Sequence, residues 1–551
     1  MIADLVVPYL PPLFDDAGAL GCGISLVVLV QGDLVVRVVR GDGRGCARRR
    51  LDLGRCGEDL PSSVGVGRRR QQCQQRQKSR GPDHGAPRVS TMWLRRRRRN
   101  SCKESSVPLI ESAGRGRLPA DTPSFTTVPL DRGVTLHHHR SDRFKTEFVR
   151  VFVRAPVDDR RTRRYLFAAL LSRGTKEFPT RRMLASHLQD LYGAGYGAAA
   201  QRMAGRHVLA LRASTAAGRF LPGKPGNLKS LLAFLSHVLD GPPTGGDGLP
   251  MPDVFEQERR SLQRDLLGRV NNKARYALDR LYGEMYAGTP LAYPDMGTED
   301  HIAAATPGAT LEEGMRTLNE GEVDIYLLAP CTPGQAERLV RRHFKLAPRS
   351  RERLIPLGLS PPRRRVRKVR EALDVEQGRL TLGFRMTDWR PGESAREGVL
   401  ANAILGGGPA SKLFRNVREE RSLCYDVHSW IDNVTGTIGI QAGIRPENYD
   451  AALKAIRAEV RAMARGRISA EEIGLARAAV LSSIRTVPDS PAGLVEFFYR
   501  RRLMKRRGKT LDAVARGFER VSTDGIPALF ERAKLDTIYF LDREELGRAT
   551  A

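Results

Sequence analysis

Long apolar runs are missing from this sequence of 551 residues. A helix that crosses a bilayer needs roughly 20 apolar residues, and the longest apolar stretch, Ile24 to Val30, is far shorter. The first residues, MIADLVVPYLPPLFDD, carry three acidic residues and no basic leader, so we expect no secretory signal peptide. We therefore expect no association with a membrane.

Cysteine is scarce outside the beginning of the chain. Five of the seven cysteines lie in the first 102 residues, only Cys331 and Cys424 lie beyond them, and no CxxC pair occurs. Irregular spacing argues against a zinc ribbon, and two isolated cysteines argue against a disulfide-stapled secreted domain. A reducing cytoplasmic location fits this pattern best.

A nucleic-acid-binding module is also missing, although the net charge is +30. Only 14 of the 92 basic residues are lysines, and arginine is spread along the whole chain. No platform of interleaved basic and aromatic residues accompanies the charge. We interpret the charge as a compositional bias toward arginine and expect no nucleic-acid partner.

Residues 1–123 lack a repeating apolar period and are rich in Arg, Gly, Gln and Ser. Such a segment buries too little apolar surface to offset its chain entropy, so disorder is predicted. One alternative is a basic arm that binds nucleic acid or membrane. Another, which we favour, is that the working protein begins downstream, for example at Met92.

The remaining sequence predicts an α+β fold in two copies, because 551 residues exceed one core. In residues 125–156, two strands are expected around the turn Asp131 to Gly133, and Val149, Val151 and Val153 alternate in the second. A helix is predicted from Thr180, its N-cap, to about Tyr192. Further elements are predicted as strands at 207–212 and 323–328 and as helices at 228–239 and from 253.

Similar segments recur in the second part of the chain. A helix followed by a strand ends each part, and the offset from Val323 to Leu535 is 212 residues. The second copy begins with an alternating strand at 380–384 and a helix at 394–405, and Ser469 with Glu472 forms a capping box. We predict domains at 124–347 and 371–545 with a linker at 348–370.

Four side chains are candidate metal ligands. His137 and His139 share one face of a strand, but a solvated strand end is the favoured interpretation. His187 and Asp190 are spaced i, i+3 on the helix from Thr180, where an exposed face is favoured because no third ligand is in view.

The stretch RRYLFAALLSRGTKEFPTRRMLASHLQDLY, 163–192, resembles the metal-binding helix of the pitrilysin and insulinase (M16) metallopeptidase family. In that family a His-x-x-Glu-His motif precedes a Gly-Thr turn, and its three positions fall here on Tyr165, Ala168 and Ala169. Positions i, i+3 and i+4 share a helix face, yet the two alanines offer neither a ligand nor a base. Glu258 matches the family's distal zinc ligand, although a salt-bridged surface glutamate is the favoured interpretation.

The segment LGGGPASKLFRNVREERSLCYDV, 405–427, resembles the C-terminal half of the same family. The resemblance implies that Arg418 and Tyr425 contact substrate, since Arg can grip peptide carbonyls and Tyr can donate to an oxyanion. The alternative is an Arg paired with Glu419 or Glu420 and a Tyr in the core. Gly406, Gly407 and Gly408 match a glycine-rich substrate loop of processing-peptidase subunits, or form a helix C-terminal turn.

The family resemblance implies two homologous domains of the LuxS and mitochondrial-processing-peptidase-like type, each a mainly antiparallel sheet packed with helices. The segments LLSRGT, DLYGA and YALDRLYGEM are similar to a bacterial group of inactive members. The similarity to this group implies a subunit that is inactive alone and binds peptides. In a heteromer, such a subunit would complete the active site of a zinc-bearing M16 partner. The alternatives are a peptide-binding scaffold without hydrolysis, and a zinc peptidase with ligands relocated among 137, 139, 187, 190 and 258.

Overall fold

A computed structural model describes residues 25–30, 33–38, 124–223, 226–349, 361–390, 394–506 and 510–543. The chain divides into two units, Pro12–Gly116 and Arg117–Ala551 with Met1–Pro11. In the smaller unit the structure describes one antiparallel hairpin, β1 (Ser25–Val30) and β2 (Asp33–Val38), which the sequence analysis did not predict. The prediction for residues 1–123 otherwise lies outside the described residues.

A six-stranded sheet forms the first half of the larger unit, in the order β3-β4-β8-β5-β7-β6. All neighbours are antiparallel except β4 and β8. The second predicted strand is in fact two, because residues 141–145, all polar except Phe144, interrupt it. The strands are β3 (Thr126–Asp131), β4 (Val134–Arg140), β5 (Thr146–Ala155), β6 (Gly195–Met203), β7 (Arg206–Ala216) and β8 (Val323–Ala329).

Helices cover one face of this sheet and bury its valines and leucines. The core includes Val149, Val151 and Val153 of β5 with Leu171 and Phe167. The helices of the first half are α1 (Arg161–Arg173), α2 (Arg181–Asp190), α3 (Asn227–Leu239), α4 (Pro252–Gly268), α5 (Lys273–Met285), α6 (Glu299–Ala303), α7 (Pro307–Glu320) and α8 (Pro333–His343). Of these, α5 packs instead against the sheet of the second half. Thr180 caps α2 as predicted, since its side chain accepts a hydrogen bond from the Met183 amide.

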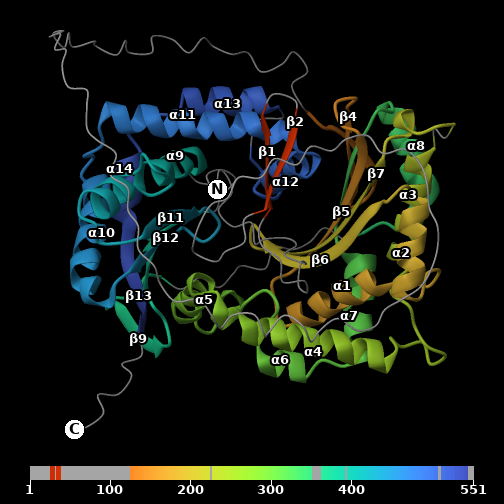
Figure 1. Ribbon diagram of the computed structural model, residues 1–551, viewed down its shortest axis with the longest axis horizontal. Coiled ribbons are helices and arrows are strands. Elements are labelled where there is room, and N and C mark those ends of the chain that lie inside the picture. Colours follow the sequence, from red (N-terminus) through yellow and green to blue (C-terminus); the bar gives the residue numbers. More distant parts are fainter. Residues whose placement is uncertain are drawn as a thin grey trace, which may run out of the picture. The chain divides into compact units, whose positions relative to one another are not determined.

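The second half carries a five-stranded sheet in the order β11-β12-β10-β13-β9, in which β13 and β9 are parallel. Figure 1 shows α10 and α14 beside β13. The strands are β9 (Arg367–Leu373), β10 (Gly378–Met386), β11 (Asp426–Asp432), β12 (Thr437–Ile444) and β13 (Ala533–Arg543). The helices are α9 (Ala395–Leu405), α10 (Tyr449–Ala464), α11 (Ala470–Thr486), α12 (Pro491–Leu503), α13 (Leu511–Glu519) and α14 (Ile526–Arg532).

The two sheets repeat one topology. The order β4-β8-β5-β7-β6 recurs as β9-β13-β10-β12-β11, and the single parallel pair occupies the same place in both. The capping box of Ser469 and Glu472 at the start of α11 is confirmed. The α+β fold of two similar halves is therefore confirmed, while the linker at 348–370 stays a prediction because residues 350–360 lie outside the described ranges.

The two halves pack against each other through buried side chains. The rings of Phe152 in β5 and Tyr499 in α12 stack with centroids 3.7 Å apart. Beside them, Arg150 and Glu496 form an ion pair of 3.0 Å, each with 7% of its side chain exposed. Helix α12 of the second half thus completes the core over the other face of the first sheet. Among the described residues, no helix has the length and apolar character of a membrane span.

Candidate functional site

Helix α1 carries the three positions of the degenerate zinc motif. Ala168 is 2% exposed and packs in the core under the first sheet, and Tyr165 packs against the apolar cluster of Leu166, Leu170 and Phe255. Within the described ranges, no three His, Cys, Asp or Glu side chains gather where they could hold a metal ion. The helix keeps its packing role, and its residues do not fit zinc.

Glu258, the distal-ligand position on α4, faces a cation of this chain instead. Nε of Arg173, the last residue of α1, donates a hydrogen bond to Oε1 of Glu258. The predicted ion pair is confirmed, but the glutamate is not on the surface, since only 14% of its side chain is exposed. A poorly exposed carboxylate needs a compensating charge, and here the guanidinium supplies it.

The three consecutive histidines of β4 do not form a solvated strand end. His137 is 3% exposed and its Nε2 lies 2.9 Å from Oδ1 of Asp324, while burial lowers its pKa. His138 is 1% exposed with Nε2 3.6 Å from Sγ of Cys331, and Nδ1 of His139 lies 2.9 Å from the Ser124 carbonyl oxygen. The expectation of a solvated end is wrong because the second half covers this face of the sheet.

The pair His187 and Asp190 on α2 is only partly exposed. The imidazole of His187 stacks on Phe178, with ring centroids 4.1 Å apart and planes at 19°. Burial lowers the pKa of His187, which keeps the ring neutral at pH 7. The predicted exposed helix face is therefore wrong at His187 and correct at Asp190.

Arg418 and Tyr425 both reach the surface of the second half. Arg418 lies in a π-helical turn, Phe414–Glu419, where its Cζ is 4.4 Å from the Phe414 ring centroid and its Nε is 3.7 Å from Oε1 of Glu419. Tyr425 is 45% exposed, and its hydroxyl accepts a 2.8 Å hydrogen bond from Nε of Arg445. Tyr425 is thus not a core residue, and the Glu419 contact of Arg418 is long.

The three glycines end α9. The Gly406 amide donates to the Asn402 carbonyl oxygen across 3.0 Å, and Oγ of Ser411 donates to the Gly408 carbonyl oxygen across 2.5 Å. A Cβ at Gly406 would lie 2.7 Å from Oγ of Ser429, so a larger residue would push α9 off β11. This geometry matches the expected helix C-terminal turn. Glycine is required at 406 because α9 packs closely on β11 there.

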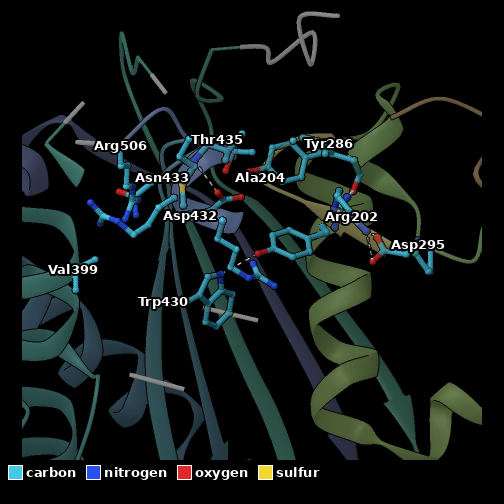
Figure 2. A pocket seen from close by; sticks show the side chains of 18 of the residues that line it. Arg202, Ala204, Tyr286, Asp295, Val399, Trp430, Asp432, Asn433, Thr435 and Arg506 are labelled. Atoms are coloured by element: carbon cyan, nitrogen blue, oxygen red, sulfur yellow. Dashed lines mark hydrogen bonds and ion pairs between the residues drawn. The ribbon is translucent and has the colours of Figure 1, made fainter. Parts of the chain in front are cut away.

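A pocket between the two halves, here called the central pocket, encloses about 1630 Å³, part of it open to solvent. Figure 2 shows Arg202 and Asp295 on one side of it and Asn433 and Arg506 on the other. Its aromatic lining includes Tyr282, Tyr286, Tyr293, Trp430, Phe497 and Phe518.

Fixed polar contacts shape the walls of the central pocket. Nε1 of Trp430 donates to the Tyr282 hydroxyl across 2.9 Å, and the Tyr286 hydroxyl contacts that of Thr437. Nε of Arg202 lies 3.6 Å from Oδ1 of Asp295. Burial raises the pKa of Tyr286, so its hydroxyl stays protonated. These walls suit the binding of a ligand with apolar and polar groups, and they present no paired nucleophile and base.

The sequence gives no indication of the central pocket, and none of Arg418, Tyr425, Gly406, Gly407 and Gly408 lines it. The segment YALDRLYGEM, 276–285, was noted for its resemblance, and its Tyr282 lines the pocket together with Tyr286, the residue that follows the segment.

Comparisons with known proteins show similarity to the M16 peptidase family. Residues 322–480 match the family model described as the peptidase M16 inactive domain. The probable inactive metalloprotease YmfF of Bacillus subtilis is 28% identical over 414 residues, covering 75% of this chain and 96% of YmfF. An uncharacterized zinc protease of Streptomyces coelicolor is 30% identical over 280 residues, covering 48% of this chain and 56% of that protein.

Solved structures show the same fold. A conserved protein from Enterococcus faecalis V583 matches with a TM-score of 0.70 and 25% identity, covering 77% of this chain and 100% of the other. A peptidase M16 inactive domain from Pseudomonas fluorescens matches with a TM-score of 0.62 and 17% identity, covering 76% and 98%. The chain is therefore similar to the inactive members of the M16 peptidase family.

Proposed function

We propose that this chain binds peptides and completes the active site of a zinc-bearing M16 peptidase in a heteromer. One observation carries the proposal: α1 has lost the zinc-motif side chains, while Arg418 and Tyr425 remain and reach the surface. Loss of the metal set removes hydrolysis by the chain alone. Because Arg418 and Tyr425 remain, the chain can still act on a peptide that a partner subunit holds.

Each residue of the pair has a distinct task in this proposal. Arg418 carries a fork of five donors that can grip peptide carbonyl oxygens. The Tyr425 hydroxyl accepts a hydrogen bond from Arg445 and keeps its own proton to donate to an oxyanion. Zinc, supplied by the partner, would activate the attacking water. Similarity to proteins named zinc proteases supports the existence of such partners in the family.

The surface position of the pair supports action across an interface. Arg418 and Tyr425 lie outside the central pocket, so a peptide that they contact would sit between this chain and another subunit. The expected assembly is therefore a heteromer with one zinc-bearing and one zinc-free subunit.

A second candidate function is peptide binding without hydrolysis in any complex. The central pocket favours it, because both halves of this chain line a large cavity that needs no second subunit. In this case the chain would act as a peptide-binding or scaffolding protein.

The test uses purified full-length chain, a zinc-bearing M16 peptidase from the same organism, and a quenched-fluorescent peptide library. The proposal expects no turnover by this chain alone and a large gain on mixing. Arg418→Ala with Tyr425→Ala should lower the mixed turnover about 100-fold or more, since removal of one oxyanion donor costs about 100- to 1,000-fold.

The exposed Arg421→Ala is the matched control, because it removes a charge from the same segment and should leave turnover unchanged. Full turnover by the double variant, or no gain on mixing, would overturn the heteromer proposal. Peptide binding without any gain would support the second candidate instead.

A further inference from the structure

Three arginines from two separate segments meet in a pocket that adjoins the central pocket. Arg501 lies in the last turn of α12, and Arg506 follows that helix. Both line the central pocket and also a second pocket that is open to solvent, where Arg396 from the first turn of α9 joins them. The Arg506 amide donates to the Arg501 carbonyl oxygen across 2.9 Å, which fixes the backbone of the two residues in one turn.

The three side chains are held by packing. A Cβ placed on Gly517 of α13 would lie 2.7 Å from Cζ of Arg396, so this guanidinium rests directly on the glycine. Arg501 is 8% exposed, and its Cζ lies 5.6 Å from the Phe497 ring centroid. Nε of Arg506 is buried and finds no acceptor among the described residues.

Among the described residues, the charges of Arg396 and Arg506 have no carboxylate partner. Other deeply buried arginines lie against a carboxylate, as Arg164 does at 2.7 Å from Glu313, or bond to backbone carbonyl oxygens, as Arg161 does. Glu397 lines the second pocket, yet in the described part of the chain no ion pair is recorded for Arg396 or Arg506. Burial and the neighbouring arginine charges lower the pKa of Arg501 and of Arg506 to about 10, so both remain charged at pH 7.

Burying like charges together is costly unless an anion neutralises them. Guanidinium groups bind a carboxylate through paired, charge-assisted hydrogen bonds. The aromatic walls of the adjoining central pocket suit the side chains of a peptide that carries that carboxylate. We infer that Arg396, Arg501 and Arg506 form a carboxylate-binding site that gives the central pocket a preference for acidic peptides.

This inference rests on the proposed peptide binding and names the class of peptide. The carboxylate can come from an Asp or Glu side chain or from a free C-terminus. Two labelled peptides of one sequence separate the sources: one has acidic side chains and an amidated end, and the other has Asn and Gln with a free end. A third peptide, neutral and amidated, is the reference.

Fluorescence anisotropy with the full-length chain measures their affinities. At least one carboxylate peptide should bind about 10- to 100-fold more tightly than the reference, the range expected for hydrogen bonds to a charged group. Arg396→Gln and Arg506→Gln should each reduce this preference toward zero. Arg516→Gln, on the exposed part of α13, is the matched control and should keep it.

Thermal unfolding checks that the Gln variants are folded. Removing one of three like charges should leave the unfolding temperature unchanged or raise it. Equal affinity for all three peptides would overturn the inference and leave peptide binding intact. A preference that both Gln variants retain would also overturn it, as would an anion site that takes inorganic phosphate without any peptide preference. Failure of every peptide to bind would remove the proposed function as well.

Discussion

Nε of Arg502 in α12 lies 2.6 Å from Oδ1 of Asp324 in β8, and this ion pair joins the two halves of the chain. Asp324 is fully buried and also contacts Arg154 and His137. Although burial opposes it, these partners lower the pKa of Asp324, which therefore stays ionised. One carboxylate thus gathers donors from β4, β5 and α12.

Asp324→Asn should lower the free energy of unfolding by about 3–5 kcal/mol, because it leaves buried cations without their counter-charge. The part due to Arg502 is weakened by solvent, since its side chain is 38% exposed. Asp489→Asn is the matched control. Asp489 also bridges the halves, at 2.6 Å from Arg143, but both partners are more than half exposed, so a loss below about 1 kcal/mol is expected. Similar losses for both variants in urea unfolding would contradict this account.

Glu147 on β5 makes stability fall as pH rises. It is 7% exposed, its Oε2 has no partner among the described residues, and burial raises its pKa to about 7 from the ordinary 4.5. The folded chain then holds a proton that the unfolded chain releases, so stability is lost between pH 4.5 and 7 and stays low above. The loss is on the order of 3 kcal/mol.

Glu147→Gln should remove this slope and make the variant more stable than the natural chain at pH 8. Urea unfolding across the pH range measures it, and Glu447→Gln on the surface is the control that should keep the slope. An unchanged slope in Glu147→Gln would show that folding does not raise the pKa of this carboxyl and would contradict the prediction.

Gly314 sets the approach of α7 to α1. A Cβ at this position would lie 2.0 Å from ring atoms of Phe167, which is fully buried. Gly314→Ala should therefore lower the free energy of unfolding by about 1–3 kcal/mol through overpacking. Gly308→Ala on the same helix would meet its nearest atom at 3.8 Å and should be neutral or slightly stabilising, since alanine favours helix. Thermal unfolding of the two variants should separate them.

Local patterns predicted much of this fold. The alternation of 380–384 and the capping box at Ser469 are properties of neighbouring residues, and both are present. Strand β6 was missed because GYGAAAQRM lacks the β-branched residues that mark a strand. The burial of His137 was missed because a strand period does not tell whether both faces of a sheet are covered.

The central pocket and the arginine cluster could not be predicted from the sequence, for a different reason. Their side chains come from segments as far apart as Arg202 and Arg506, and only the packing of the two halves brings them together. The loss of the zinc motif was readable, because Ala168 and Ala169 offer no ligand in any fold. Only the structure shows that Arg173 is the residue that forms an ion pair with Glu258.

The ion pair of Arg173 and Glu258 predicts how the Glu258 position responds to substitution. Glu258→Gln leaves a guanidinium with 29% exposure unpaired and should lower the free energy of unfolding by about 1–3 kcal/mol. Arg173→Met with Glu258→Gln should recover part of that loss, because neither charge then remains. Elemental analysis after dialysis in metal-free buffer should find near-zero zinc in the natural chain and in both variants. About one zinc per natural chain, lost in Glu258→Gln, would instead show that Glu258 is a metal ligand and that the chain should be assayed alone as a peptidase.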